Sequence, residues 1–172
     1  MPLDGSNPEG LLPADVEKCV LGCMVLWDQA ADFALNELTE EDFFGESNRA
    51  IFNVIQLLVD EGVPIDIMTL ADRLVATRKL ETAGGAAALK QLMNIVPHAA
   101  HIRYYCRILK ENSERRKRKY ISHQFSSMTI NTDSDAVFDQ KATIAWLEKE
   151  LLELSGIRKD GLKTMRDAFE AL

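Results

Sequence analysis

Helical periodicity runs through nearly the whole of this 172-residue sequence and limits what it can fold into. Apolar residues recur every three or four positions, as on one side of an α-helix, and the alternation typical of half-buried strands is nearly absent. After Pro13, one such apolar stripe continues through Val16, Cys19, Val20, Cys23, Met24 and Trp27. The pattern predicts an all-α protein.

Residues that begin and end helices divide the pattern into separate elements. Thr39, followed three residues later by Asp42, resembles a helix N-cap with an acidic first turn, and Asp66 offers another carboxylate cap. Gly62 stands where a helix would end, and the pair Gly84-Gly85 breaks the chain again. We therefore expect several short helices before one long helix that runs from about residue 99 past residue 125.

The expected elements fall into two helical parts, with a further segment on each side. Residues 1–12 are interpreted as a disordered polar tail, and residues 13–112 as a compact bundle of short helices. Residues 113–155 are expected to form a long helical hairpin, followed by a linker and the start of a short linker helix at residues 156–172.

The expected hairpin carries more apolar surface than two helices can bury against each other. Exposed apolar surface of this kind is typical of an interaction site, so the hairpin should pack on the bundle or on another copy of itself. The residues predicted for self-association are Ile121, Phe125, Ile144, Leu147 and Leu151.

The end of the chain, residues 164–172, forms a short amphipathic segment. Its apolar residues at i, i+3, i+4 and i+7 fall on one side of a helix. They are Met165, Ala168, Phe169 and Leu172. Because so short a helix is unstable alone, we expect this side to dock on a partner.

The sharpest charge feature is an unbroken run of bases made of Arg115, Arg116, Lys117, Arg118 and Lys119. Consecutive bases point in every direction around a helix, so the run is compatible with a solvated helix beside Glu111 and Glu114. A contact to DNA phosphates or to the acidic surface of a partner is the alternative. The net charge of −7 disfavours bulk nucleic-acid binding by the whole chain.

Residues that could carry chemistry are few. The segment 161–164 (GLKT) lacks the glycines of a phosphate-binding loop. Cys19 and Cys23 fall on an apolar stripe, where cysteine packs as a small hydrophobic residue. His98 and His101 could share a helix side near Cys106, but histidine near a helix start is more often a cap or a solvated side chain. We expect no catalytic residue, no metal ion and no cofactor in this chain.

Cysteine usage and hydropathy indicate the compartment. The three cysteines include no CxxC pair, which favours a reducing environment. No apolar run approaches the ~18 residues that a membrane-spanning helix needs. We therefore expect a cytoplasmic protein that makes no membrane contact.

Six short blocks follow one another along the chain in a fixed order. The first three are LPADVEKCVLG at 12–22, EEDFF at 40–44 and NRAIFNVIQLL at 48–58. The last three are GVPIDIMTLADRL at 62–74, LETAGGAAAL at 80–89 and VPHAAHIRYYCRIL at 96–109. In this order and spacing they resemble the N-terminal domain of DnaB-type replicative DNA helicases, over about residues 12–120 by motif and into the hairpin by pattern.

The sequence departs from the family's usual pattern at a few positions. Asn48 stands where the family usually has histidine before the arginine of the third block. His98 and His101 flank the paired alanines, where the family usually has serine or threonine and asparagine. These differences affect local capping and surface chemistry more than the fold.

The resemblance implies a scaffold rather than an enzyme. In such helicases these domains pair through their hairpins, and three pairs form a collar above the ring of motor domains. The collar docks primase, a helicase loader is a further partner, and the linker helix packs on the neighbouring motor domain. ATP and Mg²⁺ belong to the RecA-like motor domain, so we expect this chain to be a piece of a longer ATP-dependent helicase.

Two alternatives have a different partner or ligand. A helicase-binding domain of a primase shares the architecture, but the block PIDIMTL at 64–70 and the linker after the hairpin favour the helicase. A small single-stranded-DNA-binding module would use Arg115–Lys119, and its affinity would fall steeply with salt.

Overall fold

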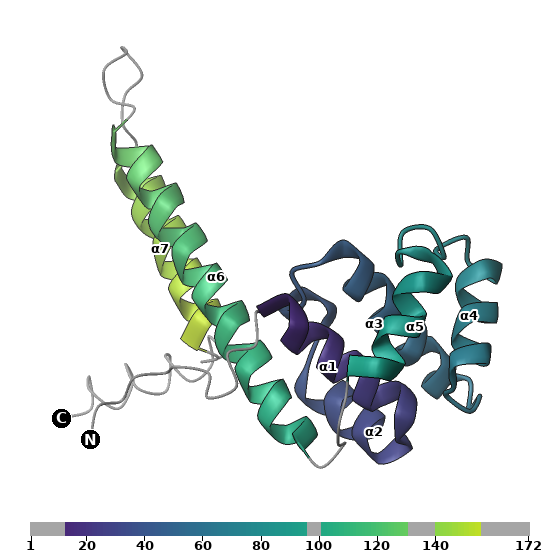
Figure 1. Cartoon of the computed structure of the whole chain (residues 1–172). Helices are drawn as coiled ribbons and strands as arrows, with labels where there is room; N and C mark the ends of the chain where they lie inside the picture. The colour runs from purple at the N-terminus through teal and green to yellow at the C-terminus, as the bar shows by residue number, and fades with distance from the viewer. Residues whose placement is uncertain (1–12, 96–100, 131–139, 156–172) are drawn as a thin grey trace. The chain divides into compact units, whose positions relative to one another are not determined.

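The computed structural model describes residues 13–95, 101–130 and 140–155, and the predicted tail and linker helix lie outside these ranges. The described residues are helical and contain no strand, which confirms the all-α prediction (Figure 1). The elements are α1 (Pro13–Leu26), α2 (Asp28–Glu37), the 3-10 turn η1 (Glu40–Asp42), α3 (Glu46–Asp60), α4 (Ile67–Ala76), α5 (Gly85–Ile95), α6 (Ile102–Ile130) and α7 (Gln140–Ser155).

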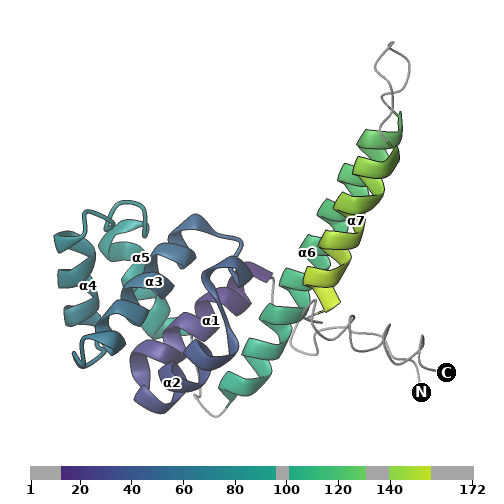
Figure 2. The same cartoon turned by 180° about the vertical axis from the view of Figure 1, so that it is seen from behind.

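The chain divides into two compact units, residues 1–113 and residues 114–172. The first unit holds α1 to α5 and the beginning of α6. The second holds the rest of α6 and α7, which run alongside each other as a helical hairpin (Figures 1 and 2). No helix within the described ranges has the length and apolar character required to cross a membrane.

Helix α1 is the centre of the first unit and packs against α2, α3 and α5. The stripe predicted from the sequence is buried, and Val16, Val20 and Met24 have no solvent exposure. The prediction is wrong for Trp27, which is 41% exposed. The reason is that α1 ends at Leu26, and Trp27 adopts an extended conformation as the N-cap of α2.

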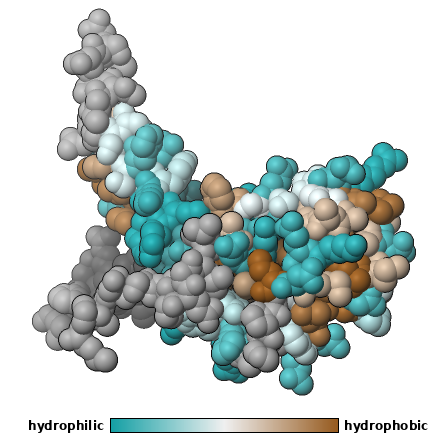
Figure 3. Space-filling view, viewed as in Figure 1, coloured by the Kyte–Doolittle hydropathy of each residue, from teal (hydrophilic) through white to brown (hydrophobic). Residues whose placement is uncertain are grey.

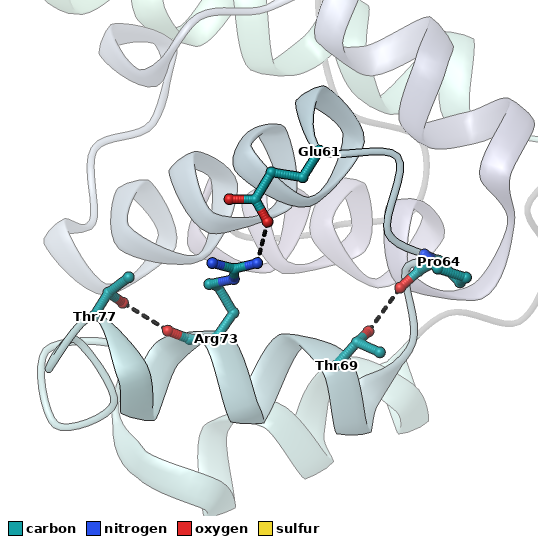
Figure 4. A network of polar contacts seen from close by, with 5 residues as sticks. All are labelled: Glu61, Pro64, Thr69, Arg73 and Thr77. Atoms are coloured by element: carbon teal, nitrogen blue, oxygen red, sulfur yellow. Dashed lines mark hydrogen bonds and ion pairs between the residues drawn. The ribbon is translucent and has the colours of Figure 1, made fainter.

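The connection between α3 and α4 follows the predicted caps. Asp66 accepts hydrogen bonds from the backbone nitrogens of Met68 (2.7 Å) and Thr69 (2.8 Å), and these bonds lower the pKa of Asp66. Gly62, at a φ of +67°, ends α3 as expected. Figure 4 shows polar contacts around α4, among them the ion pair between Arg73 of α4 and Glu61, the residue that follows α3.

Candidate interaction surfaces

The hairpin buries one side of each helix and leaves other apolar side chains exposed. Ile121 of α6 and Thr143 of α7 are buried, at 6% and 9% exposure. Ile144 and Leu151 of α7 are 47% and 51% exposed. They lie seven residues apart, which is about two helical turns, so they occupy one side of α7. Figure 3 shows hydrophobic surface along one margin of the hairpin.

These exposures change the set of residues predicted for self-association. Ile121 was predicted for this surface, but its side chain is buried, so the exposed apolar surface of the hairpin does not include it. Leu147 is half-buried. Met128, three residues after Phe125, was missed and is as exposed as Phe125, at 37%. Among the described residues of the hairpin, the exposed large apolar side chains are Tyr120, Phe125, Met128, Ile144 and Leu151.

The predicted run of bases lies on α6 and is largely exposed. Arg115, Lys117, Arg118 and Lys119 are exposed, and Arg116 is half-buried. Arg118 Nη1 lies 3.6 Å from Glu114 Oε2, an exposed pair of the kind that contributes little stability. Arg115 and Lys119 are one turn apart and lie roughly 120–160° around the helix from Ile121. They therefore face away from the hairpin interior.

The three cysteines of the first unit are buried, and burial keeps two of them, Cys23 and Cys106, protonated at neutral pH. Burial raises the pKa of Cys23 to about 12, with Cys19 adding to the effect. Burial also raises the pKa of Cys106 to about 12. Protonated thiols are poor nucleophiles and poor metal ligands. The described part of the chain contains no group of three or more His, Cys, Asp or Glu that could hold a metal ion; His98 lies outside it, and His101 is exposed.

Residues 39–46, which include η1 and lead into α3, form a turn that is held from two sides, and we call it the Phe44 turn. Glu17 of α1 is 2% exposed and accepts hydrogen bonds from the backbone nitrogens of Phe44 (2.7 Å) and Gly45 (3.2 Å). Arg49 of α3 donates from Nε to the carbonyl oxygen of Phe43 (2.8 Å) and from Nη2 to that of Phe44 (3.4 Å). The backbone of the turn is therefore held by one buried carboxylate and one guanidinium.

The start of the turn has the predicted cap. Asp42 Oδ2 accepts a hydrogen bond of 2.9 Å from the backbone nitrogen of Thr39 and a longer one of 3.4 Å from its hydroxyl. The cap closes a 3-10 turn, because the chain becomes extended at Phe43.

The two phenylalanines of the turn have opposite environments. Phe43 is fully buried, with its ring centroid 4.9 Å from that of Phe52, whereas Phe44 is 71% exposed. Exposed carboxylates flank Phe44 at Glu40, Glu41 and Glu46. Sequence periodicity did not identify this surface, because a pair of adjacent apolar residues does not reveal which one faces the core. The acidic residues on both sides of the pair were the available signal.

Comparisons with known proteins agree with these features. Residues 12–111 match the family model described as DnaB-like helicase N terminal domain. The replicative DNA helicase DnaC of Bacillus subtilis (strain 168) is 37% identical over 99 residues, covering 58% of this chain and 22% of the relative. The replicative DNA helicase DnaB of Geobacillus stearothermophilus is 30% identical over 156 residues, covering 89% of this chain and 33% of the relative. The chain thus spans between about a fifth and a third of these relatives.

Solved structures show the same fold. The crystal structure of the N-terminal domain of DnaB helicase from Mycobacterium tuberculosis has a TM-score of 0.72 and 25% identity, covering 83% of this chain and 99% of that one. The structure of a DnaB-like replicative helicase, described with its interactions with primase, has a TM-score of 0.63 and 23% identity, covering 92% of this chain and 35% of that one. With residues 12–111 matching the family model, the chain belongs to the DnaB-like helicase N-terminal domain family.

Proposed function

We propose that this chain is the assembly and primase-docking module of a replicative DNA helicase. The module pairs through its hairpin, and three such pairs form the collar of a hexamer. Unwinding of duplex DNA, with ATP and Mg²⁺, belongs to a RecA-like motor domain of the parent protein. Family membership supports the helicase, and the related structure described with primase supports that partner. The names of the relatives favour a helicase over the helicase-binding domain of a primase.

The observation that carries the assembly role is the exposure of Ile144 and Leu151 on one side of α7. Full burial of a side chain of this type stabilises by about 1.5–3 kcal/mol, and each is only half-covered in the single chain. A second hairpin placed against this side would remove both from water. Phe125 and Met128 on α6 would add to the buried area.

Sedimentation velocity of the double variant Ile144→Glu, Leu151→Glu tests this role. The wild-type chain should form dimers or larger species at about 50 µM, because association follows mass action, and the variant should be monomeric. The matched control is Met68→Glu, which changes a 74% exposed residue of the first unit and should leave association unchanged. A wild-type chain that is monomeric at this concentration would contradict the proposal.

Other parts of the proposal rest on the sequence. We propose that the side of the linker helix with Met165, Ala168, Phe169 and Leu172 docks on a neighbouring motor domain. A helicase loader is a further partner, the site of action is the cytoplasm, and no membrane contact is involved. The purified chain should hydrolyse no ATP above background, because no residues of a phosphate-binding loop are present in it.

A second candidate function, single-stranded DNA contact, is favoured by the exposure of Arg115, Lys117, Arg118 and Lys119. Such contact would release counterions, so affinity for a labelled oligodeoxythymidylate would fall steeply as salt rises. Fluorescence anisotropy at low salt tests it, and the absence of binding there would remove this candidate.

A further inference from the structure

We infer that the Phe44 turn of one copy of this chain docks on the basic run Arg115–Lys119 of a second copy. The inference rests on the self-association proposed above and adds to it a second, polar contact at a different place. Three properties of the turn support it: its exposed aromatic ring, its fixed backbone and its charge.

The phenyl ring of Phe44 is exposed to solvent, while its backbone is held in place by hydrogen bonds. The side chain is 71% exposed, although the backbone nitrogen of Phe44 donates to Glu17 and its carbonyl oxygen accepts from Arg49. Glu17 is itself buried, so the support comes from inside the first unit. An exposed aromatic residue on a fixed support loses little conformational freedom when a partner covers it, which is typical of interface hot spots.

The charge around Phe44 is negative. Glu40, Glu41 and Glu46 are exposed, and Asn53 donates to the carboxylate of Glu40. Two other charged side chains at the turn hydrogen-bond to its own backbone. Asp42 is buried and accepts from the backbone nitrogen of Thr39, and Arg49 donates to the carbonyl oxygens of Phe43 and Phe44. A partner that covers Phe44 must therefore bring positive charge.

The charge distribution of the chain identifies a matching partner surface. Residues 1–113 contain seventeen acidic and nine basic residues, a net charge of −8, while residues 114–119 contain one acidic and five basic residues, a net charge of +4. Arg115 and Lys119 face away from the hairpin interior, so they stay accessible when the hairpin is formed. An arginine guanidinium is also a favourable group to lie over an exposed aromatic ring. Two copies would make this contact twice, because the Phe44 turn of each copy would pack on the basic run of the other.

A charge-swap experiment tests this inference in the full chain. One variant carries Glu41→Lys and Glu46→Lys in the turn, and the other carries Arg115→Glu and Lys119→Glu in the basic run. Each variant alone sets like charges against each other between copies. An equimolar mixture restores opposite charges at both contacts. Circular dichroism first shows that each variant is folded.

Sedimentation equilibrium should give a clear pattern. We expect each variant alone to associate about five- to tenfold more weakly than the wild type, and the mixture to recover wild-type association, because each contact includes two exposed charge pairs. Wild-type association should weaken between about 50 mM and about 500 mM NaCl, as screening shortens the reach of the charges. Phe44→Ala should weaken association, whereas the exposed matched control Met68→Ala should not.

The outcomes separate this inference from the proposal on which it rests. If the wild type associates and Ile144→Glu, Leu151→Glu abolishes association, but the mixture gains nothing over either charge variant, the hairpin contact stands and this inference is overturned. It is also overturned if the basic run binds oligodeoxythymidylate and the mixture shows no gain, since the run would then serve nucleic acid. If the wild type is monomeric throughout, both fail.

Discussion

The buried carboxylate of Glu17 accepts a hydrogen bond of 2.7 Å from Nδ2 of Asn48, and this pair joins α1 to α3. The same carboxylate also accepts hydrogen bonds from the backbone N–H groups of Phe44 and Gly45, so one side chain satisfies three donors. A buried polar network of this kind tolerates the loss of one member poorly. The fixed position of Phe44 depends on Glu17.

Replacing Glu17 by alanine should lower the free energy of unfolding by about 3–5 kcal/mol, because three donors lose their acceptor in a buried place. Urea denaturation measures this change, and Asp15→Ala on the same helix is the control, with an expected change below about 1 kcal/mol. A double-mutant cycle with Asn48→Ala should give a coupling of about 1–3 kcal/mol. A coupling near zero would show that the Glu17–Asn48 bond contributes nothing to stability.

The end of α4 should become more stable when Arg78 is replaced by glycine. Arg78 has a φ of +57° and ends α4 in the position that Gly62 occupies after α3. A side chain in this left-handed conformation costs about 1–2 kcal/mol, and the entropy of glycine in the unfolded chain offsets part of the gain. We expect Arg78→Gly to raise the free energy of unfolding by about 0.5–1 kcal/mol. Gly62→Ala, the reverse change, should lower the free energy of unfolding. If both substitutions changed it in the same direction, this explanation would be contradicted.

The buried thiols predict how stability depends on alkaline pH. The thiol of Cys23 ionises near 9.0 in the unfolded chain, and its pKa is raised to about 12 in the folded chain, mainly by burial. Above the unfolded pKa the unfolded state holds fewer protons than the folded state, so the free energy of unfolding falls as pH rises from about 9 towards about 12. The slope approaches about 1.4 kcal/mol per pH unit for each such thiol.

Urea denaturation between these pH values measures the slope. Cys106 should contribute in the same way, since burial raises its pKa to about 12 as well. The variants Cys23→Ala and Cys106→Ala should each show a shallower dependence than the wild type, although both are less stable at neutral pH. Identical slopes in all three proteins would rule out this contribution of the thiols.

Sequence reasoning worked best where a pattern has one structural solution. Strict helical spacing placed Val16, Val20 and Met24 in the core, and the caps at Asp66 and Gly62 fixed the ends of helices because few residue types satisfy those backbone positions. The order of the six blocks led to the correct family, because their spacing carries more information than any single block.

The same reasoning was weaker where an apolar residue lies near a helix end or on a two-helix unit. Trp27 follows the stripe of α1 by spacing but falls just after the helix ends. In the hairpin, apolar residues occur on more than one side of each helix, so spacing alone does not say that Ile121 faces inward and Ile144 outward. Only the packing of α6 on α7 decides between them.

Concentration-dependent hydrogen–deuterium exchange would test the proposed hairpin association most directly. Between about 5 µM and about 100 µM, mass action should increase the associated fraction. Amides of α7 and of the second half of α6 should then exchange more slowly at the higher concentration, while those of α4 keep their rates. The Ile144→Glu, Leu151→Glu variant should show no such change. Slower exchange confined to α4 and α5, or no change anywhere in the wild type, would contradict assembly through the hairpin.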